Sequence, residues 1–127
     1  MGLDQFAYAV DPKHITSPVD FALTEEQQAS REDIAYWRKH PNLQGWMQRL
    51  YKQKGGIDPD FNCSPVQLTL EDLARLEADV VGDTLPPTGG FFFGRSTPED
   101  KAEDLTFISA ARLAIASGKA VYYTSWW

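Results

Sequence analysis

Residues 120–127, Ala-Val-Tyr-Tyr-Thr-Ser-Trp-Trp, end the chain with its clearest strand signal. Valine, threonine and the aromatic residues favour extended backbone, and successive side chains of a strand point to opposite faces of a sheet. The segment therefore predicts a C-terminal strand. One face carries Val121, Tyr123 and Ser125, and the other carries Tyr122, Thr124 and Trp126.

Two further strands are predicted upstream. Leu3–Val10 alternates in the same way, with Phe6, Tyr8 and Val10 on one face, and Asp11-Pro12 ends it. The run 91–93, three phenylalanines between glycines, is too short for a helix and is typical of a buried strand. We expect the two terminal strands to pair with the Phe91–Phe93 strand in a small, mainly antiparallel sheet.

About four helices should cover this sheet. Apolar residues recur with helical spacing from Leu43 to Tyr51, after a candidate N-cap at Asn42. Thr24 and Thr69 each precede, by three residues, a side chain that completes a capping box. The predicted helices span residues 24–39, ended by Pro41, then 43–51, 69–81 and 97–117, the last opening at Thr97-Pro98. Residues 57–66 are predicted to be irregular. The fold class is therefore α+β.

The composition fits one folded domain over residues 1–127. Four Trp, five Tyr and seven Phe are too many for a disordered chain, and 127 residues can bury one core. The sequence contains neither an apolar run long enough to cross a membrane nor a secretory signal. Cys63 is the only cysteine, so we interpret it as an incidental thiol of a reducing compartment. We expect a cytoplasmic protein with no membrane partner.

The charge is unevenly distributed along the chain. Five basic and no acidic residues lie between positions 35 and 54, whereas eleven acidic residues lie between positions 58 and 104. A net charge of −6 argues against nucleic acid as a partner, because neutralising phosphates requires a basic surface. The acidic stretch has two interpretations, a set of solvated helix faces or a surface that a partner recognises.

The sequence contains no cofactor motif and no metal-ligand spacing, so we expect neither a cofactor nor a metal. Arg38 and Lys39, close to Trp46, could clamp a planar anion such as a nucleotide, or could pair with acidic residues of the same chain. Arg95 and Ser96 could contact an anion at a helix N-terminus, although the flanking glycines suit ordinary turns. For His40 we expect a place at a helix C-terminus.

Several polar residues stand among aromatic ones, where core packing does not require them. A shared binding site is one explanation. The other is a buried network in which Asp4 or Asp104 pairs with Arg38. The residues concerned are Asp4, Arg38, Lys39, Thr88, Asp104 and Ser125.

Several blocks of the sequence, taken in order, resemble a family of small uncharacterised proteins of tailed bacteriophages and their hosts. These blocks are Met1-Gly2-Leu3-Asp4, Trp37-Arg38-Lys39, Leu85-Pro86-Pro87-Thr88-Gly89-Gly90-Phe91-Phe92-Phe93-Gly94, Glu103-Asp104-Leu105 and Tyr122-Tyr123-Thr124-Ser125-Trp126. The chain departs from the family pattern at Pro41-Asn42 and at its second terminal Trp. The resemblance implies a phage accessory product acting in the bacterial cytoplasm, and it implies no particular activity.

Two functions follow as hypotheses. The first is a non-catalytic interaction protein that binds, and could inhibit, a host protein. The second is a protein that binds a small nucleotide-like anion, or a small enzyme, through Arg38, Lys39 and neighbouring aromatic side chains. No catalytic residue can be assigned from the sequence, so whether the protein is an enzyme stays open.

Overall fold

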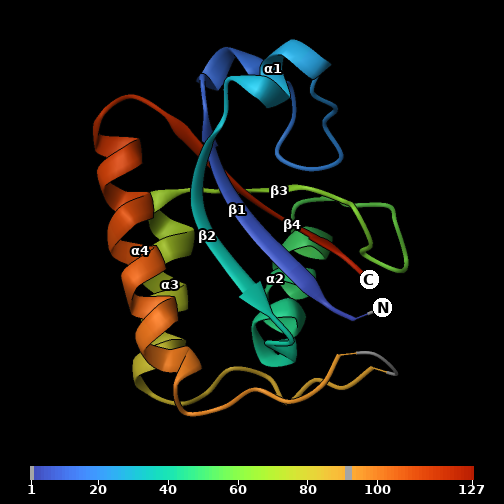
Figure 1. Cartoon of the computed structure of the whole chain (residues 1–127), viewed down its shortest axis with the longest axis vertical. Coiled ribbons are helices and arrows are strands. Elements are labelled where there is room, and N and C mark those ends of the chain that lie inside the picture. The colour runs from blue at the N-terminus through green and yellow to red at the C-terminus, as the bar shows by residue number, and fades with distance from the viewer. Residues whose placement is uncertain (1, 91–92) are drawn as a thin grey trace.

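The computed structural model describes residues 2–90 and 93–127. It contains a four-stranded sheet in the order β2-β1-β4-β3, with every neighbouring pair antiparallel. The two terminal strands lie side by side at its centre, as Figure 1 shows. The predicted α+β class is confirmed. The strands are β1 (Asp4–Val10), β2 (Glu32–Arg38), β3 (Val66–Leu68) and β4 (Ala120–Trp126).

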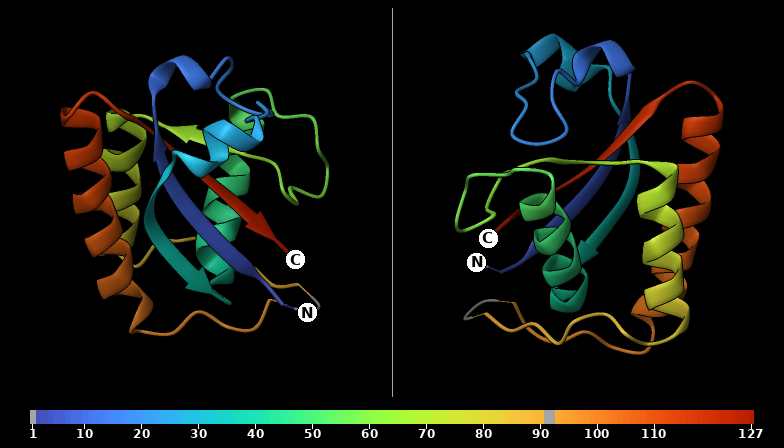
Figure 2. Two further views of the ribbon diagram at one scale, coloured as in Figure 1. Left: turned by 45° about the horizontal axis from the view of Figure 1, so that its top comes forward. Right: turned by 180° about the vertical axis from the view of Figure 1, so that it is seen from behind.

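Three long helices cover one face of the sheet (Figure 2). They are α2 (Pro41–Gln53), α3 (Leu70–Val81) and α4 (Asp100–Ala116). The 3₁₀ turn η1 (Pro12–His14) and the short helix α1 (Glu25–Ala29) belong to a segment at one end of the sheet. The main core lies between the sheet and the three long helices, and its largest fully buried side chains include Trp37, Tyr51 and Tyr123.

The face alternation predicted for the terminal strands is confirmed. Ala7, Ala9 and Tyr123 belong to the main core beneath the helices. Tyr8 and Tyr122 face the other way and pack in a second cluster with Phe21. The central strands are therefore buried on both faces along much of their length, which ties down both ends of the chain.

The helix predicted over residues 24–39 is wrong beyond its first turn. The capping box at Thr24 and Gln27 is present, but α1 ends at Ala29 and β2 follows. The pairing of β2 with β1 steps from Ala7↔Ala35 to Tyr8↔Asp33, so Ile34 forms a β-bulge. Ile34 and Ala35 consequently both pack against the main core. The bulge breaks the alternation that would have indicated a strand.

Other boundaries also differ from the prediction. Pro41 is the first residue of α2, where its missing N–H costs nothing, rather than the end of a preceding helix. The N-cap position of α2 is His40, not Asn42, and α4 opens at Asp100, after Glu99 rather than Thr97. In the predicted Phe91–Phe93 strand, residues 91 and 92 lie outside the described residues, and Phe93 lies in a turn. Of the segment predicted to be irregular, residues 57–65 lie outside helices and strands, whereas its last residue, Val66, begins β3.

The prediction for α3 is confirmed, and its first turn holds a buried carboxylate. Thr69 and Asp72 form a reciprocal capping box, and Asp72 also forms ion pairs with Lys54 and Arg75. Burial alone would raise the pKa of Asp72, but the hydrogen bonds from Lys54 and from the Thr69 amide outweigh it and lower that pKa. Asp72 therefore stabilises the folded protein in its ionised form.

This lowered pKa predicts a loss of stability in acid. A carboxylate whose pKa is lower in the folded than in the unfolded state contributes its full stabilisation above the unfolded value of about 4 and loses it as the pH falls further. We expect Asp72→Asn to reduce the free energy of unfolding at pH 7 and to flatten its decline below about pH 4. Urea denaturation between pH 7 and pH 3 measures both effects. An equally steep acid decline in the variant would contradict this assignment.

Within residues 2–90 and 93–127, no helix combines the length and apolar character that crossing a membrane requires.

Candidate functional site

The site is centred on His40, which lies between Lys39 and the first residue of α2, Pro41. Lys39 adopts a positive φ of 58°, and its N–H donates to the Leu3 carbonyl at 2.9 Å. This left-handed residue reverses the chain between Arg38, on the exposed side of β2, and the interior. The His40 side chain is only 2% exposed. His40 is therefore a buried N-cap residue and not the C-terminal cap predicted from the sequence.

Each ring nitrogen of His40 has a side-chain partner. Nε2 lies 2.9 Å from Asp104 Oδ2, and Nδ1 lies 2.7 Å from Ser96 Oγ. Asp104 is only 1% exposed, and its second oxygen accepts a hydrogen bond of 3.0 Å from Trp37 Nε1. The result is a Ser96–His40–Asp104 chain of hydrogen bonds that joins β2, α2, the loop before α4, and α4 itself.

In a neutral imidazole, the groups around the ring decide which nitrogen carries the proton. The Asp104 carboxylate can only accept, so Nε2 carries the proton and donates it to Oδ2. The Asn42 amide donates to Ser96 Oγ at 3.1 Å, which leaves the Ser96 hydroxyl free to donate to Nδ1. A hydroxyl, an imidazole and a carboxylate connected in this way are the groups that catalytic triads use.

A buried polar network fixes the backbone of His40 from behind. Gln5 accepts from the His40 amide and donates to the His40 carbonyl, both at 2.9 Å. The same Gln5 amide donates to the hydroxyl of Tyr123, which in turn donates to Gln44. Burial raises the pKa of the Tyr123 hydroxyl far above its usual range, so it stays protonated as a donor. The position of His40 is thus set by β1, β4 and α2 together.

Beside the imidazole lies an open cavity of about 510 Å³. Its polar lining residues are His40, Asn42, Ser96, Thr97, Asp100, Lys101, Asp104 and Asp83, and its apolar ones are Val80, Leu85 and Pro98. Asp100 Oδ2 lies 3.5 Å from His40 Nδ1 and accepts from the Thr97 amide at 2.7 Å. Lys101 Nζ is 3.3 Å from Asp83. We refer to this space as the His40 cavity.

The loop between α3 and α4 supplies Ser96 and is held against α2. Asn42 Oδ1 accepts from the Thr88 amide at 3.0 Å. Gly45 packs against Thr88. A Cβ atom at Gly45 would lie 3.0 Å from the Thr88 Cβ and closer still to the Thr88 hydroxyl. A glycine in the middle of α2 therefore lets the loop approach the helix backbone. Figures 1 and 2 show residues 82–90 and 93–99 of this loop passing the end of the sheet where both chain termini lie.

The structure separates most of the site residues expected from the sequence. Asp4 pairs with Arg38 at 3.0 Å and accepts from the Tyr36 hydroxyl at 2.6 Å, on the exposed side of the sheet. The hydrogen bond to Asp4 raises the pKa of Tyr36. Lys39 is exposed and its side chain lies against Gly94. Asp104 does not pair with Arg38, so of the two ion pairs considered, only Asp4–Arg38 is present.

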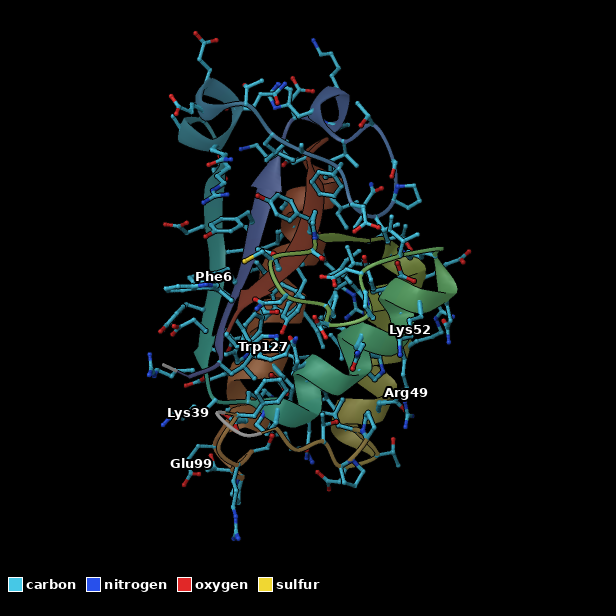
Figure 3. All side chains as sticks on the ribbon, turned by 90° about the vertical axis from the view of Figure 1, so that its right-hand side faces the viewer. Phe6, Lys39, Arg49, Lys52, Glu99 and Trp127 are labelled. Atoms are coloured by element: carbon cyan, nitrogen blue, oxygen red, sulfur yellow. The ribbon has the colours of Figure 1, made fainter. Side chains whose placement is uncertain are left out.

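The remaining expected residues lie in three other places. Trp46 donates to Asp79 at 2.8 Å, at a separate cavity of about 210 Å³. Arg95 is exposed, and Ser96 bonds to His40 instead of opening an anion site at the helix end. Ser125 is buried, and its carbonyl accepts from the Cys63 amide at 2.7 Å. Figure 3 shows Lys39 and Glu99 on one side of the molecule, on the left of the view, and Arg49 and Lys52 of α2 on the other.

Among the residues that the structure describes, three of the eleven acids in the acidic stretch form ion pairs with lysine or arginine residues of the same chain. Asp72 pairs with Lys54, Glu77 with Arg112 at 2.8 Å, and Asp83 with Lys101. The first two pairs join α3 to the C-cap of α2 and to α4, and the third joins the segment that follows α3 to the first turn of α4. Several of the acids that the sequence placed on one flank therefore serve intramolecular packing.

Sequence reasoning missed the contacts of His40 with Asp104 and with Ser96. The three residues are separated by 64 positions at most, and no local spacing connects them. The one available signal was the polar character of His40 and Asp104 beside Trp37 and Phe107, two side chains that pack edge to face with ring centres 5.0 Å apart. Among residues 2–90 and 93–127, no cluster of side chains has the composition of a metal site.

Comparisons with known proteins return no match: neither a family model, nor a curated protein, nor a solved structure is similar to this chain.

Proposed function

We propose that the protein binds a small molecule in the His40 cavity. We further propose that His40, held by its hydrogen bonds, is the side chain that acts on this molecule. The observation that supports this most directly is the position of the Ser96–His40–Asp104 chain along a cavity of about 510 Å³. Volumes of this order are typical of small-ligand sites. Burying a histidine and an aspartate together costs desolvation free energy, which packing alone would not require.

The lining of the cavity indicates the kind of ligand. Val80, Leu85 and Pro98 offer apolar surface, while Ser96 and Asn42 offer hydrogen-bonding groups. The carboxylates outnumber the single ammonium group, Lys101, which already contacts Asp83. This favours an uncharged, partly apolar ligand over the nucleotide-like anion suggested by Arg38 and Lys39, neither of which lines the cavity.

Ligand binding can be tested with a variant that fills the cavity. Thr97 lines the cavity with an exposed side chain, and the hydrogen bond that Thr97 donates to Asp100 comes from its backbone N–H. We expect members of a screen of small esters, amides and alcohols to shift the NMR resonances of His40 and Asn42 in the wild-type protein, and Thr97→Trp to abolish the shifts.

Leu113→Trp is the matched control, because Leu113 is 72% exposed on α4 and lies outside the cavity. It should bind the same molecules as the wild-type protein. Shifts that persist in Thr97→Trp, or a screen that leaves His40 and Asn42 unaffected, would overturn the proposed site.

A second function, binding of a host protein by a phage accessory product in the bacterial cytoplasm, is favoured by a different observation. Leu113 on α4 is 72% exposed and Val81 on the neighbouring α3 is 56% exposed, so both offer apolar surface that a protein partner would cover. Affinity capture from a bacterial lysate should recover a partner with the wild-type protein and lose it with Leu113→Glu. Equal recovery by both would exclude this surface.

A further inference from the structure

We propose that Ser96 is a nucleophile and that the His40 cavity carries out acyl transfer on a small uncharged ester. This inference rests on the ligand site proposed above and adds a covalent step to it. Ser96, His40 and Asp104 have the roles of nucleophile, general base and orienting carboxylate, respectively.

The distances support these roles. Ser96 Oγ lies 2.7 Å from His40 Nδ1, within the range for direct proton transfer from the hydroxyl to a general base. Asp104 Oδ2 lies 2.9 Å from Nε2, where it can stabilise the imidazolium that forms after this transfer. The Trp37 indole and the burial of Asp104 keep the carboxylate in place. The two ring nitrogens exchange their usual triad roles, which the chemistry permits because either nitrogen can accept a proton.

Asn42 supplies hydrogen-bond donors beside the nucleophile. Its backbone N–H, in the first turn of α2, donates to Ser96 Oγ at 3.1 Å and stabilises negative charge developing on that oxygen. Its side-chain oxygen accepts from the Thr88 amide, which leaves the side-chain NH₂ as the group that can donate, and Asn42 lines the cavity. An amide donor of this kind can bind the oxyanion of a tetrahedral intermediate.

The proposed reaction consumes only the ester and one water molecule. Ser96 Oγ attacks the ester carbonyl carbon while its proton passes to His40 Nδ1. The tetrahedral intermediate then collapses, the carbon–oxygen bond to the alcohol breaks, and Nδ1 returns the proton to the departing alkoxide. Water attacks the acyl-Ser96 ester with His40 again accepting a proton, and Ser96 is regenerated with release of a carboxylic acid.

A fluorophosphonate probe tests for the nucleophile directly, because it forms a stable covalent bond with an activated serine. We expect the wild-type protein to gain one probe adduct, located at Ser96 by peptide mass spectrometry, and to hydrolyse p-nitrophenyl acetate with an initial burst. Ser96→Ala should lose both, and His40→Gln should slow labelling by about 10²-fold or more, the typical contribution of a general base. Ser117→Ala, at the exposed C-terminal end of α4, is the matched control and should label like the wild-type protein.

Circular dichroism establishes that each variant is folded, and Asp104→Asn offers a second measurement if His40→Gln does not fold. With Asn at position 104, an amide donor can face Nε2 and reverse the tautomer, so labelling should slow while Trp37 keeps an acceptor. Ligand shifts at His40 without any adduct at Ser96 would overturn the nucleophile and leave the binding site standing. Labelling that is unchanged in Ser96→Ala would also overturn it.

Discussion

Replacing Asp104 with alanine should lower the free energy of unfolding by about 2–6 kcal/mol, because two buried donors would lose their acceptor at a cost of about 1–3 kcal/mol each. The variant would leave the His40 imidazole and the Trp37 indole without their common acceptor, in a position where Asp104 is 1% exposed. Small domains are typically stable by about 5–15 kcal/mol, so this single change would remove a large share of the total. Urea denaturation followed by tryptophan fluorescence measures the loss.

Two matched variants test whether the loss of stability comes from the hydrogen bonds of Asp104 or from a change in the helix α4. Glu103→Ala changes the exposed neighbouring residue of α4 and should alter stability by no more than about 0.5 kcal/mol. Asp104→Asn keeps an acceptor for the indole and should lose less than Asp104→Ala. A loss below about 1 kcal/mol for Asp104→Ala, near the value of an ordinary hydrogen bond, would show that the His40–Asp104 pair contributes little to the fold.

Replacing Gly45 with alanine should displace the loop that carries Ser96. The new methyl group would stand 3.0 Å from the Thr88 Cβ and clash with the Thr88 hydroxyl, so the loop backbone must move. Alanine would stabilise an isolated helix by about 1 kcal/mol relative to glycine, yet we expect a net loss of about 1–3 kcal/mol from overpacking. The measurable sign is faster amide hydrogen exchange in residues 84–90 and 93–97, together with loss of the Ser96–His40 contact.

The same loop provides both a rescue and a control. Thr88→Gly removes the atoms that the new methyl group would meet, so the double variant Gly45→Ala/Thr88→Gly should regain stability relative to Gly45→Ala. Gly89→Ala is the control, because a Cβ at Gly89 would meet nothing within 4 Å. Equal loop exchange in the Gly45→Ala and Gly89→Ala variants would refute the close approach of Thr88 to α2.

Local chemistry explains which elements the sequence could predict. The strands β1 and β4 alternate regularly, α2 has a helical apolar stripe, and α3 has a capping box, and each of these signals lies within a few consecutive residues. The strand β2 was missed because the bulge at Ile34 places two successive apolar residues against the core. The strand β3 was missed because it is only three residues long.

In the candidate site, too, the sequence could predict local features but not contacts between distant segments. The sequence identified Asp104 as a polar residue in apolar surroundings, and it offered Arg38 as the partner. The left-handed Lys39 turns Arg38 and His40 to different sides of the chain, so the guanidinium reaches Asp4 at the surface while the imidazole reaches Asp104 inside. Such a choice between neighbouring residues depends on one backbone torsion, which residue type alone does not set.

By itself, then, the sequence determined an α+β domain with its two terminal strands in one sheet and aromatic side chains in its core. Hydrophobic periodicity and capping act over short distances along the chain, so they can be read from it. The tertiary structure alone decided that Ser96, His40 and Asp104 meet at one cavity. Their contact depends on the β2–α2 turn, on the position of α4 and on a loop seated over Gly45, which form only when distant segments pack together.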